Sequence, residues 1–329
     1  MTRILTRLMA VVALGAFVAF APVAQAQQVN PTANSVTEDK LFQALKDDQM
    51  VAGRVSIPDE GAAGLIKPGN KGWAATHTGT VKTLSIVAVL GTLALLVVFY
   101  LVRGKIRIDA GPSGRKILRF SALERFAHWL MAGSFIVLAL TGLNLVIGRS
   151  VLLPLIGEGG FGTLTAYGKL AHNYVGWAFM LGLGLSFLLW VARNIPHGRD
   201  VAWLAQGGGL LKKGVHPPAG KFNAGQKIIF WAVSLGGLAL SVTGYFLLFP
   251  AEAGTQADWQ FLQLVHGLVS AGLSAIILAH IYIGSVGMEG AFDAMGTGEV
   301  DENWAKEHHS VWVEEVKAKS GNARTTPAE

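Results

Sequence analysis

Five long apolar stretches, separated by shorter polar segments, dominate the chain after residue 82. Each has about the 20 residues that an α-helix needs to cross the hydrocarbon core of a bilayer. The pattern therefore predicts an all-α membrane protein with five spanning helices, at residues 83–102, 126–147, 170–192, 228–249 and 261–286.

A shorter apolar run at residues 9–20 follows two arginines and precedes the small-residue segment 24–26. This order is typical of a secretory signal peptide, although an uncleaved anchor would share it. We expect 1–26 to be the signal peptide. Residues 27–82 carry six basic and six acidic side chains, which predicts a loosely ordered periplasmic arm. We expect His77, within this arm, to be a solvated loop residue.

Lysine and arginine are distributed unevenly among the connections between the apolar stretches. Connections 103–125 and 193–227 hold seven and six basic residues, whereas 148–169 holds two and 250–260 holds none. Loops on the cytoplasmic side of a membrane are enriched in these residues. The distribution predicts a multi-pass protein of the bacterial inner membrane, with a periplasmic N-terminus and a cytoplasmic tail at residues 288–329.

Composition limits the chemistry that this chain can carry. The 329 residues are 51% hydrophobic and 15% charged, and none is cysteine. Disulfides, cysteine-bound iron–sulfur clusters and covalently attached c-type haem are thereby excluded. The net charge of +6 lies mainly in two connections, which favours membrane orientation over nucleic-acid binding. A metal centre in this chain has to rest on histidine or carboxylate side chains.

His266 and His280 lie fourteen residues apart in the stretch 261–286, which has no Asp, Glu, Lys or Arg. Fourteen residues of α-helix turn through about 1400° and rise about 21 Å, so both imidazoles face one side at different depths. Near the predicted cytoplasmic surface, His128 matches the depth of His280. His172 matches the depth of His266 near the outer surface. Depth alone thus predicts an inner pair, His128/His280, and an outer pair, His172/His266.

Ionisable residues inside a membrane are costly and indicate function. Two depth-matched histidine pairs are typical of two haem b groups with histidine on both sides of each iron, an arrangement suited to electron transfer. A single such histidine would more commonly be a hydrogen-bonded core residue. The residue four positions after each histidine is small, which leaves space for a macrocycle, although ordinary helix packing would also favour small residues. These residues are Ala132, Gly176, Ser270 and Gly284.

Four segments together resemble the γ subunit of respiratory formate dehydrogenase, a di-haem cytochrome b of the inner membrane. They are RFSALERFAHWLMAGSFIVLALTG at 119–142, KFNAGQKIIFW at 221–231, the two histidines of 266–280, and WAKEHH at 304–309. The resemblance extends from about residue 118 to 315. It implies a di-haem four-helix core at 118–287, to which the helix at 83–102 is an extra N-terminal addition.

The resemblance also implies a function and partners. An iron–sulfur β subunit would pass electrons to the outer haem of His172 and His266, then to the inner haem of His128 and His280, and finally to quinone. A separate catalytic α subunit would oxidise formate, because the apolar helices of this chain show no nucleophile–base pair or paired carboxylates. By the same resemblance, Asn223, Gly225 and Gln226 would line the quinone pocket near the inner haem.

The residues of the segment N-A-G-Q are compatible with that role. Amide side chains can hydrogen-bond a quinone carbonyl, and Gly225 would allow a ring to approach the backbone. Asn223 could equally be the N-cap of the following helix, and the two roles are compatible. The remaining histidines of the loops and the tail lie in polar sequence and are predicted to be surface residues; they are His197, His216, His308 and His309.

Two other functions fit the same pattern. A cytochrome b subunit of another periplasmic enzyme, such as a hydrogenase or a thiosulfate reductase, would have the same haems and differ in its partners. A transporter or passive membrane anchor would use the four histidines as hydrogen-bonded core residues and would bind no haem.

Overall fold

The computed structural model describes residues 72–73 and 75–325, with side chains described as far as Lys319. The chain divides into two units, Met1–Gly72 and Trp73–Glu329, and the helices and strands with described bounds belong to the second. The predicted signal peptide and residues 27–71 of the predicted arm lie outside the described residues.

Five helices of the described part are long and apolar enough to cross a membrane. Each overlaps one of the five predicted stretches, and the predicted all-α membrane fold is confirmed. The helices are α5 (Lys82–Arg103), α6 (Ala122–Leu143), α8 (Leu153–Trp190), α10 (Ala224–Leu248) and α11 (Gln256–Tyr282).

Short helical segments lengthen several of these helices beyond the predicted bounds. A π-helical segment, η1 (Thr76–Val81), precedes α5, so the last residues of the predicted arm are helical. The segments η2 (Asn144–Gly148) and α7 (Arg149–Val151) follow α6, and η6 (Ile283–Gly287) follows α11. Helix α8 begins well before residue 170, although Gly157, with φ of 69°, interrupts its first turns.

Three spanning helices begin at a reciprocal capping box, in which the N-cap side chain and the third helical side chain each accept a backbone N–H. This arrangement satisfies N–H groups that the first helical turn leaves without partners. The pairs are Ser121 with Glu124 for α6, Asn223 with Gln226 for α10, and Thr255 with Asp258 for α11.

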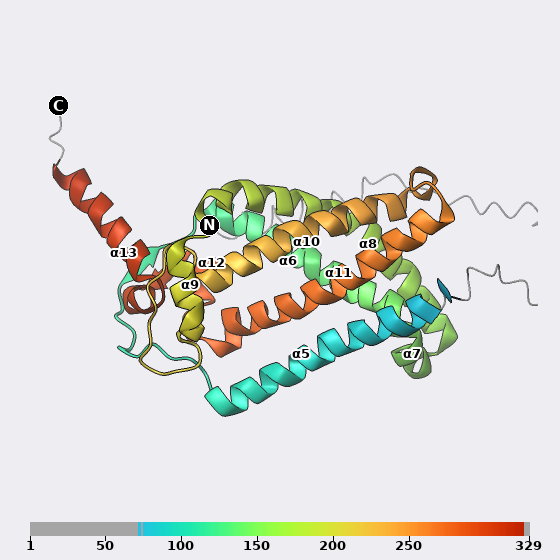
Figure 1. Ribbon diagram of the computed structural model, residues 1–329, viewed down its shortest axis with the longest axis horizontal. Coiled ribbons are helices and arrows are strands. Elements are labelled where there is room, and N and C mark those ends of the chain that lie inside the picture. Colours follow the sequence, from blue (N-terminus) through green and yellow to red (C-terminus); the bar gives the residue numbers. More distant parts are fainter. Residues whose placement is uncertain (1–71, 74, 326–329) are drawn as a thin grey trace, which may run out of the picture. The chain divides into compact units, whose positions relative to one another are not determined.

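The helices pack as two neighbouring pairs with α5 added outside them. Helix α6 packs along α8 and α10 along α11, α8 also contacts α10, and α5 contacts α11 (Figure 1). Glycine allows the closest approaches: a Cβ on Gly182 would lie 2.7 Å from the backbone nitrogen of Met131. Helices in membranes associate largely through such close contacts between small residues.

The outward faces of the helices are apolar. Leu95 on α5 and Leu188 on α8, for example, are 70% and 75% exposed. A continuous apolar surface of this kind is unfavourable in water and favourable against lipid. The chain is therefore a multi-pass membrane protein.

Outside the spanning helices, short elements gather at the end of the bundle where α6 and α10 begin (Figure 1). Strand β1 (Lys116–Leu118) pairs antiparallel with β2 (Glu299–Asp301), with Ile117 opposite Val300. The other elements are the helices α9 (Gly198–Ala205), α12 (Asp293–Gly296) and α13 (Glu302–Thr325), with the single turns η3 (Val191–Arg193) and η4 (Gly207–Gly209); η5 (Pro250–Glu252) lies between α10 and α11.

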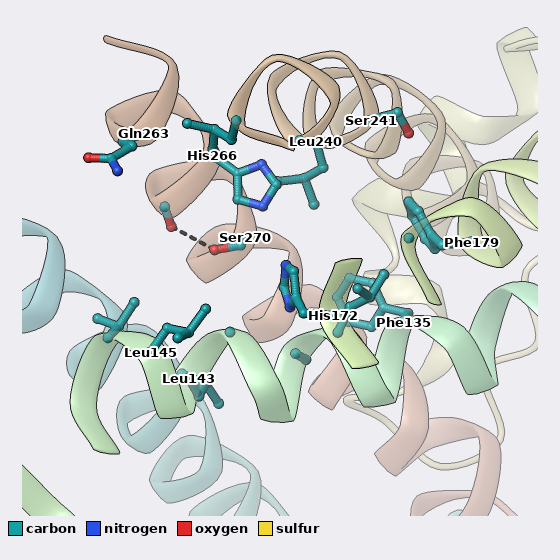
Figure 2. Close-up of a pocket in the computed structure, with 18 of the residues that line it drawn as sticks. Phe135, Leu143, Leu145, His172, Phe179, Leu240, Ser241, Gln263, His266 and Ser270 are labelled. Carbon is teal, nitrogen blue, oxygen red and sulfur yellow. Dashed lines mark hydrogen bonds between the residues drawn. The ribbon is translucent and has the colours of Figure 1, made fainter. Parts of the chain in front are cut away.

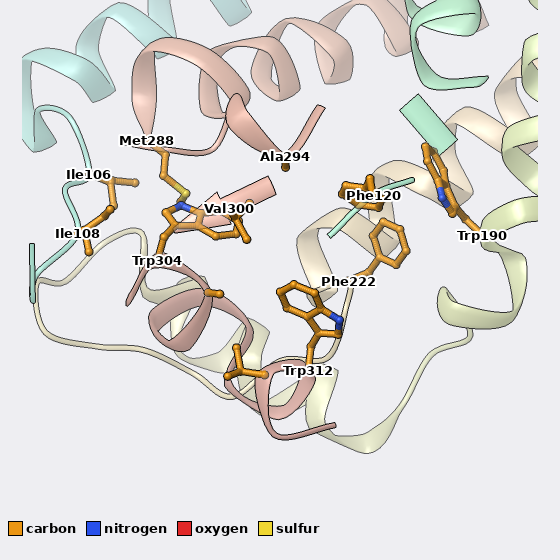
Figure 3. Packing of buried hydrophobic residues seen from close by; sticks show 12 residues of the cluster. Ile106, Ile108, Phe120, Trp190, Phe222, Met288, Ala294, Val300, Trp304 and Trp312 are labelled. Atoms are coloured by element: carbon orange, nitrogen blue, oxygen red, sulfur yellow. The ribbon is translucent and has the colours of Figure 1, made fainter. Parts of the chain in front are cut away.

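The tail is docked against this end rather than free. Trp304 and Trp312 of α13 are 3% and 6% exposed and belong to a buried cluster that also contains Phe120, Trp190 and Phe222 (Figure 3). Aromatic side chains of this size bury 150–250 Å² each and dominate the energetics of such clusters. The cluster therefore fixes the segments on which the candidate quinone residues lie.

Candidate haem and quinone sites

The predicted outer pair is brought together by α8 and α11. The ring centroids of His172 and His266 lie 6.3 Å apart, with the ring planes at 61°, and the two rings approach each other across the gap between helices (Figure 2). Imidazole binds first-row metal ions at about 2 Å, so two rings on opposite sides of one iron have centroids on the order of 6 Å apart. The spacing fits a shared iron.

Threonine hydroxyl groups fix both rings of the outer pair. Thr141 Oγ1 lies 2.8 Å from His172 Nδ1, and Thr243 Oγ1 lies 2.8 Å from His266 Nδ1. Each hydroxyl also donates to the carbonyl four residues earlier, at 2.7 Å. With its hydrogen used in this way, the hydroxyl accepts from Nδ1–H, which leaves the other ring nitrogen, Nε2, free to bind a metal.

Glycine follows each of these threonines and lies against the ring. A Cβ on Gly142 would lie 3.5 Å from His172 Cε1, and one on Gly244 would lie 3.4 Å from His266 Cε1. A Cβ at these distances would be in ordinary van der Waals contact with the ring, so only a side chain larger than alanine would press on it. The Thr-Gly pair therefore has the same role on α6 and on α10: the hydroxyl orients the imidazole, and the glycine keeps a bulky side chain away from it. The repeat is visible in the sequence at residues 141–142 and 243–244, and its position against the rings appears only in the structure.

A cavity of about 370 Å³ surrounds the outer pair. This volume is within the range of sites for small molecules and cofactors. Its lining is largely apolar and includes two of the predicted small residues, Gly176 and Ser270. A Cβ on Gly176 would meet nothing within 4 Å, so open space adjoins this glycine, as a flat macrocycle requires.

The extra helix contributes to this cavity. His77 in η1, and Val81 and Ser85 beside it, are among the lining residues. The prediction that His77 is a solvated loop residue is wrong: it is half-buried in a helical segment. Val81 is 1% exposed because it packs against Gly267 of α11, where a Cβ would lie 2.8 Å from Val81 Cγ1.

The predicted inner pair is brought together by α6 and α11. The ring centroids of His128 and His280 lie 6.2 Å apart, with the planes at 63°, nearly the geometry of the outer pair. His128 Nδ1 is buried and has no hydrogen-bond partner among the described residues. An unsatisfied polar atom in a buried site is costly, and this ring nitrogen lacks the threonine contact that both rings of the outer pair have.

The four histidines occur as pairs only. In the described part of the chain, no group of three or more His, Cys, Asp or Glu is placed to hold a metal ion. A bare transition-metal ion usually takes three or four ligands from protein side chains. Two ligands per site suit haem iron, whose other ligands are porphyrin nitrogens.

Asn223 and Gln226 are engaged in the capping box of α10. Gln226 N–H donates to Asn223 Oδ1 at 2.9 Å, and Asn223 N–H donates to Gln226 Oε1 at 3.1 Å. The N-cap alternative is therefore confirmed, and the amide NH₂ groups remain as donors. A Cβ on Gly225 would lie 3.1 Å from the ring of Trp203, so the backbone here is approached by a tryptophan of α9.

Two residues beside this segment were missed by sequence reasoning. Arg119 is 4% exposed and donates to Lys221 O at 2.8 Å and to Gln226 Oε1 at 3.3 Å; one of its amino groups lies 2.8 Å from His309 Nε2. His309 is 1% exposed, so its predicted position at the surface is wrong. The neighbouring His308 is half-buried, which also differs from the prediction.

Burial shifts the proton affinities of this cluster. Desolvation lowers the pKa of Arg119 to about 9, opposed by the charge of Glu124. Desolvation and, second, the charge of Arg119 lower the pKa of His309 well below its usual value. Desolvation with the nearby His216 and Arg119 lowers the pKa of His308 to about 4. Both histidines are therefore neutral at pH 7, and Arg119 is the positive group beside Gln226.

Comparison with known proteins bears on these sites. The chain is 30% identical over 207 residues to the nitrate-inducible formate dehydrogenase cytochrome b556(Fdn) subunit of Escherichia coli (strain K12), which covers 62% of this chain and 93% of that protein. It is 28% identical over 204 residues to the cytochrome b556(fdo) subunit of the same strain, covering 61% and 93%. It is 28% identical over 209 residues to the formate dehydrogenase cytochrome b556 subunit of Haemophilus influenzae, covering 62% and 85%. These matches confirm the resemblance noted from the sequence motifs.

A family assignment follows from residues 119–298, which match the family described as prokaryotic cytochrome b561. This segment contains all four histidines of the two pairs and both threonines that contact the outer pair, whereas α5 and α13 lie outside it. The helical bundle and the spacing of the histidines agree with a family of haem b proteins. The chain belongs to the prokaryotic cytochrome b561 family.

Proposed function

We propose that this chain is the membrane cytochrome b subunit of a formate dehydrogenase and passes electrons through two haem b groups to quinone. The observation that carries the proposal is the pair of histidine contacts, 6.2 and 6.3 Å between ring centroids, at two levels of one bundle. The names of the three relatives favour formate dehydrogenase over the hydrogenase and thiosulfate reductase alternatives.

In this proposal His172 and His266 bind the outer iron, and His128 and His280 bind the inner iron. Haem b held by these histidines would supply one-electron redox chemistry. The protein holds the imidazoles in orientation, through Thr141 and Thr243 at the outer site, and surrounds the outer site with apolar side chains. Both features control a redox potential.

Helix α11 supplies one ligand to each site and sets their separation. The fourteen residues from His266 to His280 correspond to a rise of about 21 Å. His172 and His266 would therefore hold one haem, and His128 and His280 the other, at two levels of the bundle, the arrangement that electron transfer across it needs.

Quinone would be reduced beside the inner pair, at the start of α10. The amide NH₂ groups of Asn223 and Gln226 are the donors for a quinone carbonyl. Arg119 supports this proposal because it holds Gln226 Oε1 at 3.3 Å and so directs the rest of that amide. Its charge would also stabilise negative charge on a reduced ring.

The charge distribution of the loops supports an orientation for this path. With the connections of α5–α6 and α8–α10 cytoplasmic, the outer pair lies near the periplasm and the quinone segment near the cytoplasm. Formate oxidation by a periplasmic catalytic α subunit yields CO₂, one proton and two electrons. An iron–sulfur β subunit would deliver those electrons, and each quinone would take two electrons with two cytoplasmic protons. A transmembrane potential would result without a proton channel in this chain.

The test of the quinone site separates capping from quinone binding. Asn223→Ser keeps a good N-cap and removes the amide donor, whereas Asn223→Asp also keeps the cap and adds charge. Both variants should retain two haems and their reduction by formate in the complex, and both should slow reoxidation by added quinone. Ser121→Asn, a cap exchange on α6, serves as the control and should reoxidise at the wild-type rate. Wild-type reoxidation in both Asn223 variants would show that the assigned quinone site is wrong.

A further inference from the structure

A second cavity, of about 430 Å³, lies at the C-terminal end of α5. Its walls come from Tyr100 and Arg103 of α5, from segments 104–109 and 208–216, and from His308 of α13. It contains none of the haem-ligand or quinone candidates, and the proposed function gives it no role.

The lining of this cavity carries an excess of positive charge. One acidic residue, Asp109, lines it, and its carboxylate is already engaged by His216 Nε2 at 3.0 Å and by Gly214 N–H at 3.1 Å. Among the described residues, the ion pairs include none of the cavity's five Lys and Arg side chains. These are Arg103, Lys105, Arg107, Lys212 and Lys213.

Backbone contacts hold the walls in place. Arg103 Nε donates to Leu210 O at 2.7 Å, which ties the 208–216 segment to the end of α5 and leaves the other N–H groups of this guanidinium for a ligand. Ile106 N–H donates to Gly287 O at 2.8 Å and anchors the segment 104–109 to η6. Five basic residues therefore line a space whose walls are joined by hydrogen bonds before any ligand arrives, which lowers the entropic cost of binding.

The cavity lies where a spanning helix ends. Leu101 and Val102, beside the lining residues, are 76% and 83% exposed and apolar, as is expected of side chains that face lipid. Tyr100 is an aromatic side chain of the type enriched at the membrane–water interface. A ligand in the cavity would thus place its charged group near the lysine and arginine residues and an adjoining apolar group along the surface of α5.

We propose that this cavity binds the phosphate-bearing headgroup of an anionic phospholipid. Lysine and arginine pair strongly with phosphate oxygens, and basic pockets beside spanning helices on the cytoplasmic side recognise such headgroups. Inorganic phosphate offers the same oxygens, but the exposed Leu101 and Val102 favour a ligand with acyl chains. The bound lipid would fasten α5, the 208–216 segment and α13 together.

The experiment uses the full chain, purified in detergent and stripped of lipid. Phosphatidylglycerol and phosphatidylcholine with identical acyl chains are titrated in mixed micelles, and bound lipid is counted by native mass spectrometry. Wild type should bind phosphatidylglycerol in preference to phosphatidylcholine. The double variant K212Q/K213Q should bind phosphatidylglycerol roughly thirtyfold more weakly, at about 1 kcal/mol for each removed charge, and K212R/K213R should keep wild-type affinity.

The control is K116Q/K319Q, which removes two exposed charges outside the cavity and should leave the affinity unchanged. Equal binding of the two lipids would overturn the proposal, as would an equal loss in the control, because either result describes general surface attraction. Displacement of phosphatidylglycerol by millimolar inorganic phosphate would assign the site to free phosphate instead. None of these results depends on haem or quinone, so the proposed function is tested separately.

Discussion

Thr243, one of the two threonines at the outer histidine pair, gives the most specific prediction about haem chemistry. Thr243 is 5% exposed and its hydroxyl accepts from His266 Nδ1 at 2.8 Å. Thr243→Val keeps the shape of the side chain and removes the acceptor. The His266 N–H is then buried without a partner, and this imidazole becomes a weaker electron donor to the iron that we propose it binds.

The size of the effect follows from the strength of the hydrogen bond. A net contribution of about 0.5–1.5 kcal/mol is typical, and a one-electron couple shifts by about 59 mV for each 1.4 kcal/mol. If the bond acts mainly on the oxidised iron, Thr243→Val raises the midpoint potential of the outer haem by roughly 20–60 mV. Thr141→Val should do the same through His172, since the two contacts have the same length.

A spectroscopic redox titration of the purified protein measures this shift. Thr243→Ser should restore the wild-type potential because it restores the hydroxyl. Ser241→Ala is the matched control: its hydroxyl donates to the carbonyl four residues earlier, Gly237 O, at 2.7 Å, and no contact of that hydroxyl with His266 is present. An unchanged outer potential in Thr243→Val, or an equal shift in Ser241→Ala, would refute the role assigned to the threonine.

Three further predictions test other parts of the account. Gly142→Val or Gly244→Val should displace the adjacent imidazole and lower the content of the outer haem, measured by absorbance, whereas Gly133→Val, with nothing within 4 Å of its Cβ, should have no such effect. Alkaline phosphatase fused after residue 255, on the proposed periplasmic side, should be active. Fusions after residue 212 or 329, on the proposed cytoplasmic side, should be inactive, and the reverse pattern would contradict the proposed orientation. Burial lowers the folded-state pKa values of His308 and His309. Docking of α13 should therefore weaken as pH falls below about 6.5, because the undocked histidines take up protons there. Each histidine should reduce the free energy of docking by up to about 1.4 kcal/mol per pH unit. Limited proteolysis of the tail should therefore be faster at pH 5.5 than at pH 7.5, and His309→Gln should reduce that difference.

The five helices could be predicted from the sequence, and so could the partner of each histidine in the two pairs. Both depend on quantities that act along one helix: the length of an apolar stretch and the depth of a residue within it. His266 and His280 share one helix, so their separation needed no knowledge of packing. The loop charges then gave the depth order of His128 and His172, and the structure brings the same two pairs together.

The threonine contacts could not be predicted because they depend on how each helix is rotated about its axis. A helix that is apolar on every side gives no signal of which side faces its neighbour. The histidine partners of Thr141 and Thr243 are 31 and 23 residues away on other helices. The recurring Thr-Gly was visible, but nothing in it identified a partner.

The burial of His309 was missed for a related reason. Its neighbours in the sequence are polar, and its environment is formed by Arg119 and Gly220, which are 190 and 89 residues away. Local polarity therefore indicated a surface position, whereas tertiary docking of α13 created a buried one. His77 was misjudged in the same way, because the cavity it lines belongs mainly to α6, α8, α10 and α11.

The central claim is that the two histidine pairs each bind one haem b, and haem counting in single variants tests it most directly. A pyridine haemochrome assay on the purified wild-type chain should give two haems per chain. His172→Ala and His266→Ala should each leave one haem with the same spectrum and potential, and His128→Ala and His280→Ala should each leave the other. One haem or none in wild type, or different remaining haems in the two variants of one pair, would contradict the account.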